Sequence, residues 1–566
     1  AGDRRMSRVV VVGGGAGGLA VAARLAVRRH DVTLLEQAPT TGGKLATYRQ
    51  DGFAFDTGPS LLTLPAVYRD LFLKTGGPLE EAIDLQPVEP GFAYWFADGS
   101  TVTVPGVDPA RAAAAFGAAL GGTAERDWRR VIERGGRMWQ LTREPFLQRP
   151  LDGWRTLLGL ARSTDDVRTI APWMSLRDLG TDLVADPRLR QVLDRYATYT
   201  GSDPRRAPAA LATIPYMEQT FGVWHIGGGL GGLADALTAR CVERGVRVRT
   251  GCEVTRVVMQ SGRAAGVQLA DGEILPADIV VSDADARELY GRLVDAAPAR
   301  RARRALARST SSLSGFVILL AVRGRTAGLA HHNVWFPADY DAEFDAVFAR
   351  AARPVDDPAV YACVPDDPRM RPDDDHESWF ILVNAPRHGQ GAGAIDWDAP
   401  GLADRYADRV LDVLATRGTD LRDRVLWRRV HSPADLERST RAPGGAIYGP
   451  SSNGARAAFR RPANASPVPG LYLVGGSAHP GGGLPLVGLG AEIVPPGDGR
   501  EQVRYARGAR LIADLSGHDL RVEPLAQRDR RHDELVAELR AQPLGPLVEH
   551  RDDDLRRVSL GGVLCD

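Results

Sequence analysis

The amino-acid sequence predicts an α/β protein with a discontinuous nucleotide-binding domain, a mostly helical insertion and a mixed α+β domain. Three observations support this fold class. A glycine-rich turn between two apolar stretches opens the chain, short strand patterns follow residue 245, and another apolar strand runs into glycines at residues 470–476. The 566 residues are too many for one simple core, so roughly two to three domains are expected.

The first predicted element is a βαβ unit. Residues 8–12 are mostly valine, a helical pattern follows the glycines, and residues 31–35 form a second apolar strand. Glu36 ends this strand, where a carboxylate can accept hydrogen bonds from an adenosine ribose, and Gln37 follows it. Strand, helix, strand and terminal acid together predict a bound dinucleotide of Rossmann type.

The residues of the glycine turn have distinct expected roles. Gly13 permits the tight turn, Gly15 lets the backbone approach a pyrophosphate, and Gly18 lets the helix pack closely on the strand. Ala16 and Gly17 lie at the helix N-terminus, where the amides and the helix dipole favour phosphate charge. We therefore assign all five residues to the predicted cofactor-binding set.

A second glycine loop indicates which dinucleotide binds. It follows Glu36 closely, and its two adjacent glycines and one cation form a second phosphate-contacting loop, which nicotinamide enzymes rarely place there. The predicted contacts of this region are Gly42, Gly43, Lys44, Gly58, Pro59 and Ser60. The prediction is FAD.

Later segments complete the same domain. Residues 245–282 alternate short strands with turns, as expected for a small sheet that includes Val254. Glycines at Gly475 and Gly476 let the backbone approach a flavin, and the next helix N-terminus, at Leu486 and Val487, offers amides to it.

The predicted domain boundaries follow from these elements. The nucleotide-binding domain takes residues 1–90, 225–284 and 442–494, and residues 91–224 form a mostly helical region for substrate or membrane contact. The remaining parts are a substrate domain at 285–441 and a C-terminal extension at 495–566.

Composition narrows the function classes. A net charge of zero argues against a nucleic-acid partner. The four cysteines show neither CxxC pairing nor metal-ligand spacing, so no metal site is expected, and a reducing, cytoplasmic setting fits. The most apolar late stretch, residues 470–491, is rich in glycine and proline, so no bilayer span is expected. Peripheral contact with the inner face of the membrane stays open.

Three features have a structural and a functional interpretation. Residues 227–232 repeat the GxGxxG pattern, but the strand after them ends without an acid, so no separate NAD site is expected. His479, beside Pro480, is expected to be structural rather than a catalytic base. The tryptophans of the helical region form either an aromatic core or a membrane-facing surface: Trp128, Trp139, Trp154 and Trp173.

Motifs along the chain resemble those of one family. They lie at residues 195–204, 207–209, 448–449, 459–462 and 475–485. Together with residues 13–60, they resemble the bacterial phytoene desaturase and carotenoid desaturase family, FAD-dependent oxidoreductases of the amine-oxidase superfamily. The likeness covers residues 8–494, and Lys44 stands where the family usually carries arginine.

The resemblance implies a function. A hydride would pass to the flavin N5 of FAD, introducing double bonds into an apolar, carotenoid-like polyene. No catalytic residue is assigned, because the cofactor carries the redox chemistry. With no NAD site expected, the electron acceptor would be quinone or oxygen. Exposing a polyene of about 40 carbons to water costs roughly 30 kcal/mol, so delivery from a membrane is expected.

Other functions remain open from the residues alone. A shorter polyene tethered to a carrier protein would need no membrane, and a redox-neutral isomerase would yield products of unchanged mass. A non-enzymatic lipid-binding protein, similar to Rab GDP-dissociation inhibitors, would hold no flavin. An amine oxidase would need an aromatic cage around a polar substrate.

Overall fold

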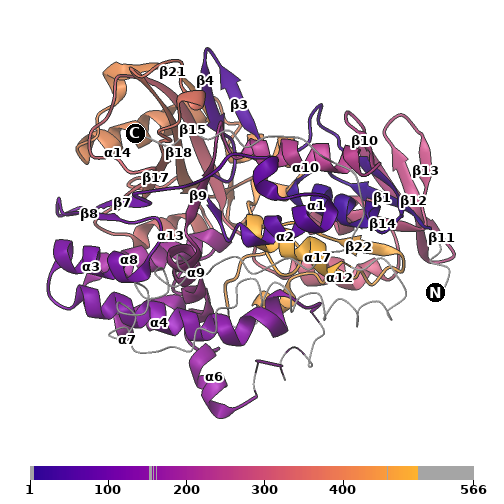
Figure 1. Cartoon of the computed structure of the whole chain (residues 1–566), viewed down its shortest axis with the longest axis horizontal. Coiled ribbons are helices and arrows are strands. Elements are labelled where there is room, and N and C mark those ends of the chain that lie inside the picture. The colour runs from indigo at the N-terminus through magenta and orange to yellow at the C-terminus, as the bar shows by residue number, and fades with distance from the viewer. Residues whose placement is uncertain (1–5, 152–155, 157–158, 161, 455–456, 495–566) are drawn as a thin grey trace, which may run out of the picture. The chain divides into compact units, whose positions relative to one another are not determined.

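The structure is a computed structural model that describes residues 6–151, 156, 159–160, 162–454 and 457–494 (Figure 1). Trp154, Cys565 and the predicted extension at 495–566 lie outside these residues. All described residues belong to the first of the chain's two compact units, residues 1–509. None of the helices in this described part is long and apolar enough to cross a membrane.

A five-stranded parallel sheet forms the nucleotide-binding region. Its strands, in spatial order, are β10 (Arg247–Arg249), β2 (Asp31–Leu35), β1 (Arg8–Val12), β14 (Ile279–Ser282) and β22 (Leu471–Leu473). All three predicted segments contribute to it. In β1, Val9 and Val11 join one hydrophobic core, whereas Val10 and Val12 join another. Burial on both faces explains why this strand is a continuous apolar run.

Helices and a second sheet cover the two faces of this parallel sheet. One face packs against α1 (Ala16–Ala26), α2 (Ala66–Thr75), α10 (Gly231–Glu243) and α17 (Leu484–Ile493). The other packs against α11 (Ala286–Glu288), α12 (Ala299–Ala307) and an antiparallel sheet of β11 (Val254–Gln260), β12 (Arg263–Leu269) and β13 (Ile274–Pro276). The small sheet expected between residues 245 and 282 is therefore present.

A seven-stranded sheet forms the core of the second region. Its order is β21 (Val425–His431), β15 (Ser314–Arg323), β18 (His376–Ala385), β17 (Val360–Cys363), β16 (His332–Trp335), β7 (Phe92–Trp95) and β8 (Thr101–Val104). Helix α14 (Leu402–Thr416) packs on one face. Strands β7 and β8 come from the segment expected to be mostly helical. They belong to this sheet because β7 pairs in parallel with the distant β16, and β8 pairs with β7.

Helices dominate the remainder of residues 91–224. They are α3 (Pro109–Leu120), α4 (Ala124–Thr142), α6 (Thr164–Ile170), α7 (Leu176–Leu183), α8 (Pro187–Arg195) and α9 (Thr213–Phe221). Trp128 and Trp139 are buried in this region, whereas Trp173 is 64% exposed. Of these three tryptophans, Trp128 and Trp139 thus belong to a core and Trp173 to the surface.

Trp128 offers a direct test of this helical core. Its side chain is fully buried, and its indole Nε1 donates a hydrogen bond to Oε1 of Gln219 at 3.0 Å. Trp128→Ala should lower the free energy of unfolding by about 3–5 kcal/mol through cavity formation. Trp173→Ala, the matched control at an exposed site, should change it by less than about 0.5 kcal/mol. Urea denaturation of both variants checks this, and equal losses would contradict the assignment of the core.

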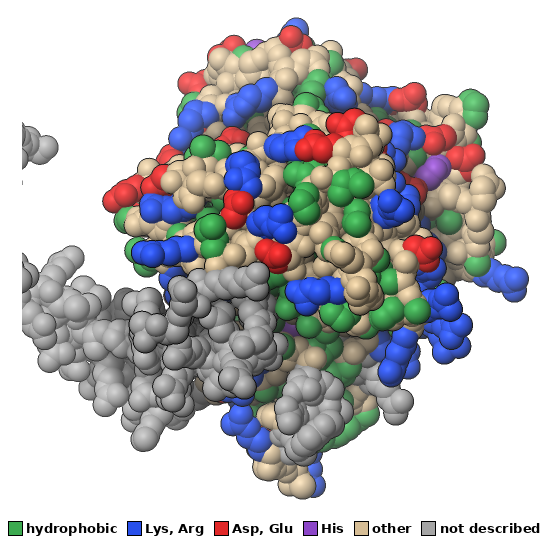
Figure 2. All heavy atoms as spheres, turned by 90° about the vertical axis from the view of Figure 1, so that its right-hand side faces the viewer, with side chains coloured by type: hydrophobic (Ala, Val, Ile, Leu, Met, Phe, Trp, Pro, Cys, Tyr) green, Lys and Arg blue, Asp and Glu red, His purple; other side chains and the backbone are tan. Residues whose placement is uncertain are grey.

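Shorter elements connect these regions. They are β3 (Thr47–Gln50), β4 (Phe53–Asp56), β5 (Leu62–Thr63), β6 (Leu85–Pro87), β9 (Val223–Ile226), α13 (Asp341–Phe348), β19 (Arg387–His388), β20 (Ala394–Ile395), α15 (Pro433–Thr440) and α16 (Ala457–Arg460). On the face shown in Figure 2, basic and acidic side chains are interspersed, in keeping with the zero net charge.

The second glycine-rich turn, residues 227–232, lies outside the parallel sheet. The strand before it, β9, pairs with β5 and β6 instead. The Leu230 amide donates to the Asp56 carboxylate at 2.7 Å, and the Gly228 amide donates to the Asp367 carboxylate at 2.7 Å. Side chains of the protein itself therefore satisfy the amides that a phosphate would need.

Candidate cofactor-binding cavity

A cavity of about 500 Å³ lies where the parallel strands end. Val12 and Leu35 are the last residues of β1 and β2, and Asp283 and Gly475 follow β14 and β22; all four line the cavity. Ligands of open α/β sheets bind in the crevice outside the carboxyl ends of the strands. The position of this cavity is therefore the one expected for a dinucleotide.

Most of the predicted cofactor-binding residues line this cavity. They are Gly13, Gly15, Ala16, Gly17, Glu36, Gln37, Gly42, Gly43, Lys44, Gly58, Pro59, Val254, Gly475, Gly476 and Val487. Segments more than 400 residues apart in the sequence thus meet around one space.

Three predicted residues lie outside the lining. A side chain at Gly18 would collide with the carbonyl oxygen of Gly13, so this glycine serves the packing of α1 on β1. Ser60 Oγ is hydrogen-bonded to the Tyr361 hydroxyl at 2.7 Å. Leu486 packs in an apolar cluster with Leu489 and other residues.

The glycine turn after β1 is shaped for close backbone approach. Gly13 has a φ of 98°, a conformation that favours glycine, and its amide donates to the carbonyl oxygen of Leu35 at 2.8 Å. A Cβ at Gly17 would lie 2.9 Å from the backbone nitrogen of Gly475. The turns after β1 and β22 therefore lie against each other, and both line the cavity.

Glu36 is held at the end of β2 by two amides. Its Oε2 accepts from Gly14 at 2.7 Å and its Oε1 from Ala38 at 2.8 Å, and the residue is buried. Each carboxylate oxygen keeps a lone pair that can accept from a ribose hydroxyl. The fixed carboxylate thus matches the role predicted for it.

Asp283 was not predicted, although its carboxylate is central to the turn. Burial raises the pKa of Asp283 to about 7, and the nearby Glu36 adds to this, while the amides of Gly18 and Gly15 and the Lys44 ammonium oppose it. An ionised carboxylate here would compete with a diphosphate for the same amides. The only sequence signal was an acid directly after an apolar strand.

Lys44 connects two loops of the cavity. Its Nζ donates to the carbonyl oxygen of Ile447 at 2.7 Å. Burial lowers the pKa of Lys44, and the carboxylates of Asp285 and Asp283 oppose this. The predicted phosphate contact of Lys44 stays a prediction, while its structural contact is to backbone.

Arg461 is a second residue that sequence reasoning did not assign. Its Nη1 donates to the carbonyl oxygens of Tyr448 at 2.9 Å and Gly476 at 2.7 Å, and its Nη2 donates to that of Pro450 at 2.8 Å. Burial lowers the pKa of Arg461 to about 10. This one guanidinium joins the two loops, at 447–450 and 475–476, that bound the cavity.

The opposite wall of the cavity is apolar. Strands β15 and β18 of the seven-stranded sheet contribute Gly315, Val317, Phe380 and Leu382 to it. The cavity therefore combines amide-rich turns on one side with a hydrophobic surface on the other, as a redox cofactor and an apolar substrate together require.

His479 does not line the cavity. It is buried, its Nε2 donates to the carbonyl oxygen of Arg149 at 3.0 Å, and burial lowers its pKa to about 4. Its contacts are those of a structural histidine.

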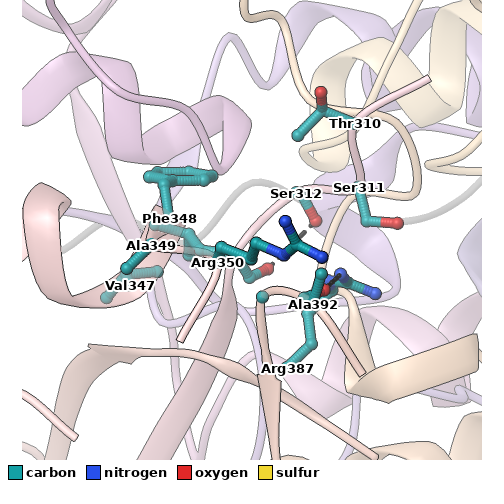
Figure 3. Close-up of a pocket in the computed structure, with 11 residues that line it drawn as sticks. Thr310, Ser311, Ser312, Val347, Phe348, Ala349, Arg350, Arg387 and Ala392 are labelled. Atoms are coloured by element: carbon teal, nitrogen blue, oxygen red, sulfur yellow. Dashed lines mark hydrogen bonds between the residues drawn. The ribbon is translucent and has the colours of Figure 1, made fainter. Parts of the chain in front are cut away.

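A smaller cavity of about 240 Å³ lies elsewhere (Figure 3). Arg350 and Arg387 line it beside Ser311 and Ser312. It contains none of the predicted site residues.

Comparisons with known proteins agree with this geometry. Residues 16–485 match the family model described as "Flavin containing amine oxidoreductase". The chain is 33% identical to 4,4'-diapolycopene oxygenase of Methylomonas sp., over 86% of this chain and 97% of that protein. It is 34% identical to hydroxyneurosporene desaturase of Rubrivivax gelatinosus, over 86% and 92%.

Solved structures share the fold. An oxidoreductase from Methanosarcina mazei aligns with a TM-score of 0.58 and 19% identity, covering 86% of this chain and 98% of that one. Wild-type putrescine oxidase aligns with a TM-score of 0.56 and 15% identity, covering 90% and 99%.

Proposed function

The chain belongs to the family of flavin-containing amine oxidoreductases and is an FAD-dependent oxidoreductase, and from this premise we propose that it desaturates an apolar, carotenoid-like polyene. One observation carries the proposal: the cavity joins the turn after β1 to the apolar wall of β15 and β18. The relatives named hydroxyneurosporene desaturase and diapolycopene oxygenase support a polyene over an amine substrate.

The residues of the cavity fit FAD. Ala16 and Gly17, at the start of α1, line the cavity, and their backbone amides would hold the diphosphate, while the Glu36 carboxylate would hold the ribose. The close approach of Gly17 to Gly475 leaves no room for side chains on this cradle. The segment at 475–476 and the N-terminus of α17, at Val487, would lie along the flavin. When bound, FAD supplies the hydride acceptor.

The protein's own contribution is orientation and exclusion of water. Val317, Phe380 and Leu382 would pack against the polyene and hold its reacting carbons next to the cofactor. Gly315 keeps this wall flat, because an added Cβ would lie 2.7 Å from Leu382 Cδ1. The chemistry therefore needs a shaped apolar surface more than an acid–base pair.

Partners follow from the substrate's insolubility. Exposing about 40 apolar carbons costs roughly 30 kcal/mol, so we place the protein in the cytoplasm, in peripheral contact with a membrane that delivers the polyene. Quinone or oxygen would reoxidise the flavin. A carrier-tethered shorter polyene is the alternative that this proposal competes with.

Anaerobic bleaching of the flavin absorbance tests the function. Carotenoid precursors in liposomes are compared with short carrier-tethered polyenes, and products are weighed by mass spectrometry. Bleaching by the liposomal carotenoid with loss of two hydrogens supports the proposal. Products of unchanged mass would indicate an isomerase, and bleaching by the tethered polyene alone would overturn the carotenoid assignment. A parallel incubation in air detects an oxygenase, whose products would gain oxygen.

Glu36 provides a test of the cofactor site alone. Glu36→Ala should raise the dissociation constant for FAD at least about tenfold, because the ribose loses its acceptor and two amides lose their partner. Fluorescence titration of the apoprotein with FAD measures it. Glu273→Ala, which removes an exposed carboxylate paired with Arg249, should bind FAD as the wild type does. Equal affinities of both variants would contradict the ribose contact.

A further inference from the structure

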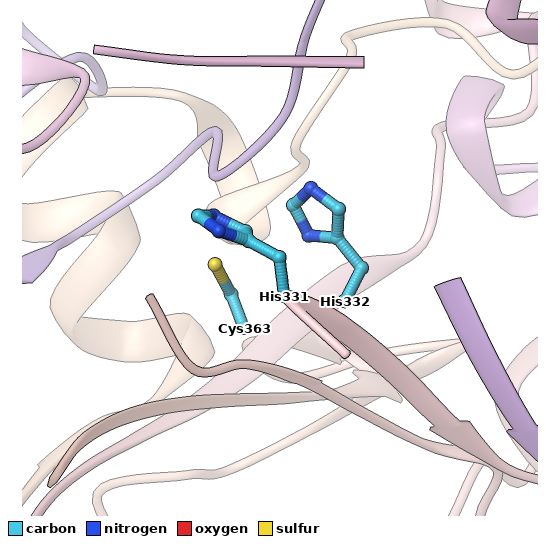
Figure 4. A group of neighbouring side chains, drawn as sticks. All are labelled: His331, His332 and Cys363. Carbon is cyan, nitrogen blue, oxygen red and sulfur yellow. The ribbon is translucent and has the colours of Figure 1, made fainter. Parts of the chain in front are cut away.

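Two histidines and a cysteine at neighbouring strands of the seven-stranded sheet lie close together (Figure 4). His332 opens β16 and pairs directly with Cys363, the last residue of β17, and His331 precedes the strand. One nitrogen of each histidine and the sulfur of Cys363 all lie within 4.8 Å of one another. From this geometry we propose that His331, His332 and Cys363 bind one Zn²⁺ ion.

The distances suit a tetrahedral ion after small side-chain rotations. Zinc–nitrogen bonds of about 2.0 Å and zinc–sulfur bonds of about 2.3 Å place neighbouring ligand atoms roughly 3.5 Å apart. Three protein ligands leave the fourth position to water, and His331 is partly exposed, which gives the ion a path from solvent. Binding would release the thiol proton of Cys363 to water.

His332 supplies an independent observation. Its Nδ1 is hydrogen-bonded to the Tyr361 hydroxyl at 2.8 Å, and that hydroxyl also bonds Ser60 Oγ at 2.7 Å. Its Nε2 is buried and has no hydrogen-bond partner among the described residues. A histidine with one nitrogen fixed by a neighbouring oxygen and the other left without a partner has the arrangement of a metal ligand and its supporting shell.

A third imidazole borders the group. The His225 ring lies 4.9 Å from the His331 ring, its Nε2 is 3.0 Å from the Asp367 carboxylate, and its Nδ1 is also buried without a partner in the described structure. This neighbouring ring encloses the group on the side of His331.

The donor atoms select the ion. Two imidazole nitrogens and a thiolate suit Zn²⁺, whereas Mg²⁺ and Ca²⁺ prefer oxygen. The other group of possible ligands, His388, Asp396 and Asp398, is largely exposed and carries no comparable orphaned atom among the described residues.

The ion would stabilise the wall of the cofactor cavity. Cys363 Sγ lies 3.9 Å from the carbonyl oxygen of Ser60, which follows the cavity-lining pair Gly58-Pro59. Cys363 also pairs across the sheet with Phe380, another lining residue. A bound ion would therefore hold the seven-stranded sheet and the segment at 58–60 together, whatever substrate the protein uses.

The test compares metal content in matched cysteine variants. Full-length, flavin-loaded protein is dialysed against ZnCl₂, then against metal-free buffer, and its zinc is measured by mass spectrometry. The control is Cys241→Ser, because Cys241 is also a buried free cysteine but is hydrogen-bonded to the Leu19 carbonyl oxygen. We expect about one zinc per chain in the wild type and in this control, and at least a tenfold loss of zinc in Cys363→Ser. Absence of zinc from the wild type, or equal zinc in Cys363→Ser, would overturn the proposal.

A second measurement keeps the test decisive where Cys363→Ser folds poorly. Chelator-treated Cys241→Ser is titrated with CoCl₂, and ligand-field absorption at wavelengths beyond the flavin bands is recorded. Tetrahedral cobalt with a thiolate ligand is expected, and His332→Asn should weaken its binding at least tenfold. An octahedral spectrum, or cobalt binding unchanged in His332→Asn, would exclude the site. Flavin occupancy is recorded in the same samples and should be the same in the wild type and the variants. A loss of metal binding with unchanged flavin is thereby distinguished from failure of the proposed function.

Discussion

Apoprotein carrying Asp283→Asn should bind FAD with nearly the same affinity at pH 6 and pH 8, whereas wild-type affinity should fall about tenfold over this range. The reason is the place of the Asp283 carboxylate, which accepts from the amides of Gly15 and Gly18. Of the two, Gly15 lines the cavity, and its amide would face the diphosphate. A neutral Asp283 leaves the phosphate charge unopposed, and an ionised one repels it.

The sign follows from the direction of the pKa shift. Burial raises the pKa of Asp283 to about 7, so the acid is protonated below that pH and ionises as the pH rises through it. A bound diphosphate would raise this pKa further, so FAD binding takes up a proton and weakens with increasing pH. In the apoprotein, the raised pKa means that the folded state holds a proton which the unfolded chain loses near pH 4, so stability should decline as the pH rises from about 4 to about 7 and level off above it. Among neighbouring titratable groups, Glu36 raises the pKa of Asp283 and Lys44 lowers it, while Asp283 in turn raises the pKa of Tyr68.

Fluorescence titration with FAD at pH 6, 7 and 8 measures the effect. Asp278→Asn is the matched control, since Asp278 lies at the opposite end of β14, is exposed and pairs with Arg8. It should keep the wild-type pH dependence. If the FAD affinity of Asp283→Asn fell with pH as steeply as that of the wild type, another group would control the proton uptake.

Replacement of Arg461 by methionine should have the largest effect on retention of the cofactor. The three carbonyl oxygens that this guanidinium binds would lose their donor in a buried setting, at about 1–3 kcal/mol each. Removal of a desolvated charge offsets part of that cost. We expect a net loss of at least about 3 kcal/mol in the stability of the holoprotein, with FAD released on gel filtration.

Arg460→Met is the control for Arg461, because the neighbouring side chain is exposed. It should retain flavin and change stability by less than about 0.5 kcal/mol. Arg461→Lys should be intermediate, since an ammonium cannot span the same oxygens as the planar guanidinium. Thermal unfolding and flavin occupancy of the three variants measure the difference, and full retention of FAD in Arg461→Met would refute the clamp.

Local patterns predicted the parts of the fold that depend on neighbouring residues. The valines of β1, the turn at Gly13 and the acid at Glu36 all lie within one βαβ unit, and the structure places them as expected. The spacing of apolar residues and the glycines of the turn suffice there, because each element is specified by its own sequence.

The rest depends on contacts between distant segments. Asp283 looks like any acid after a strand until β14 sets it against the turn of α1. The reach of Arg461 to Tyr448 and Gly476 requires two loops to be in place. Strands β7 and β8 could not be assigned to the second sheet because their partner, β16, lies more than 200 residues later. His332 and Cys363 likewise meet only through the register of β16 and β17.

The order of strands in the parallel sheet has a consequence for biosynthesis. β1 is made first but lies in the middle, and its neighbour β14 ends at Ser282, while β22 ends at Leu473. One edge of β1 therefore stays unpaired while more than 250 further residues leave the ribosome, and such an edge invites wrong pairing. Folding of this domain must be largely post-translational and slow, since its contacts span nearly the whole described chain. Chaperone supply during expression should accordingly limit the yield of native protein more than its final stability does.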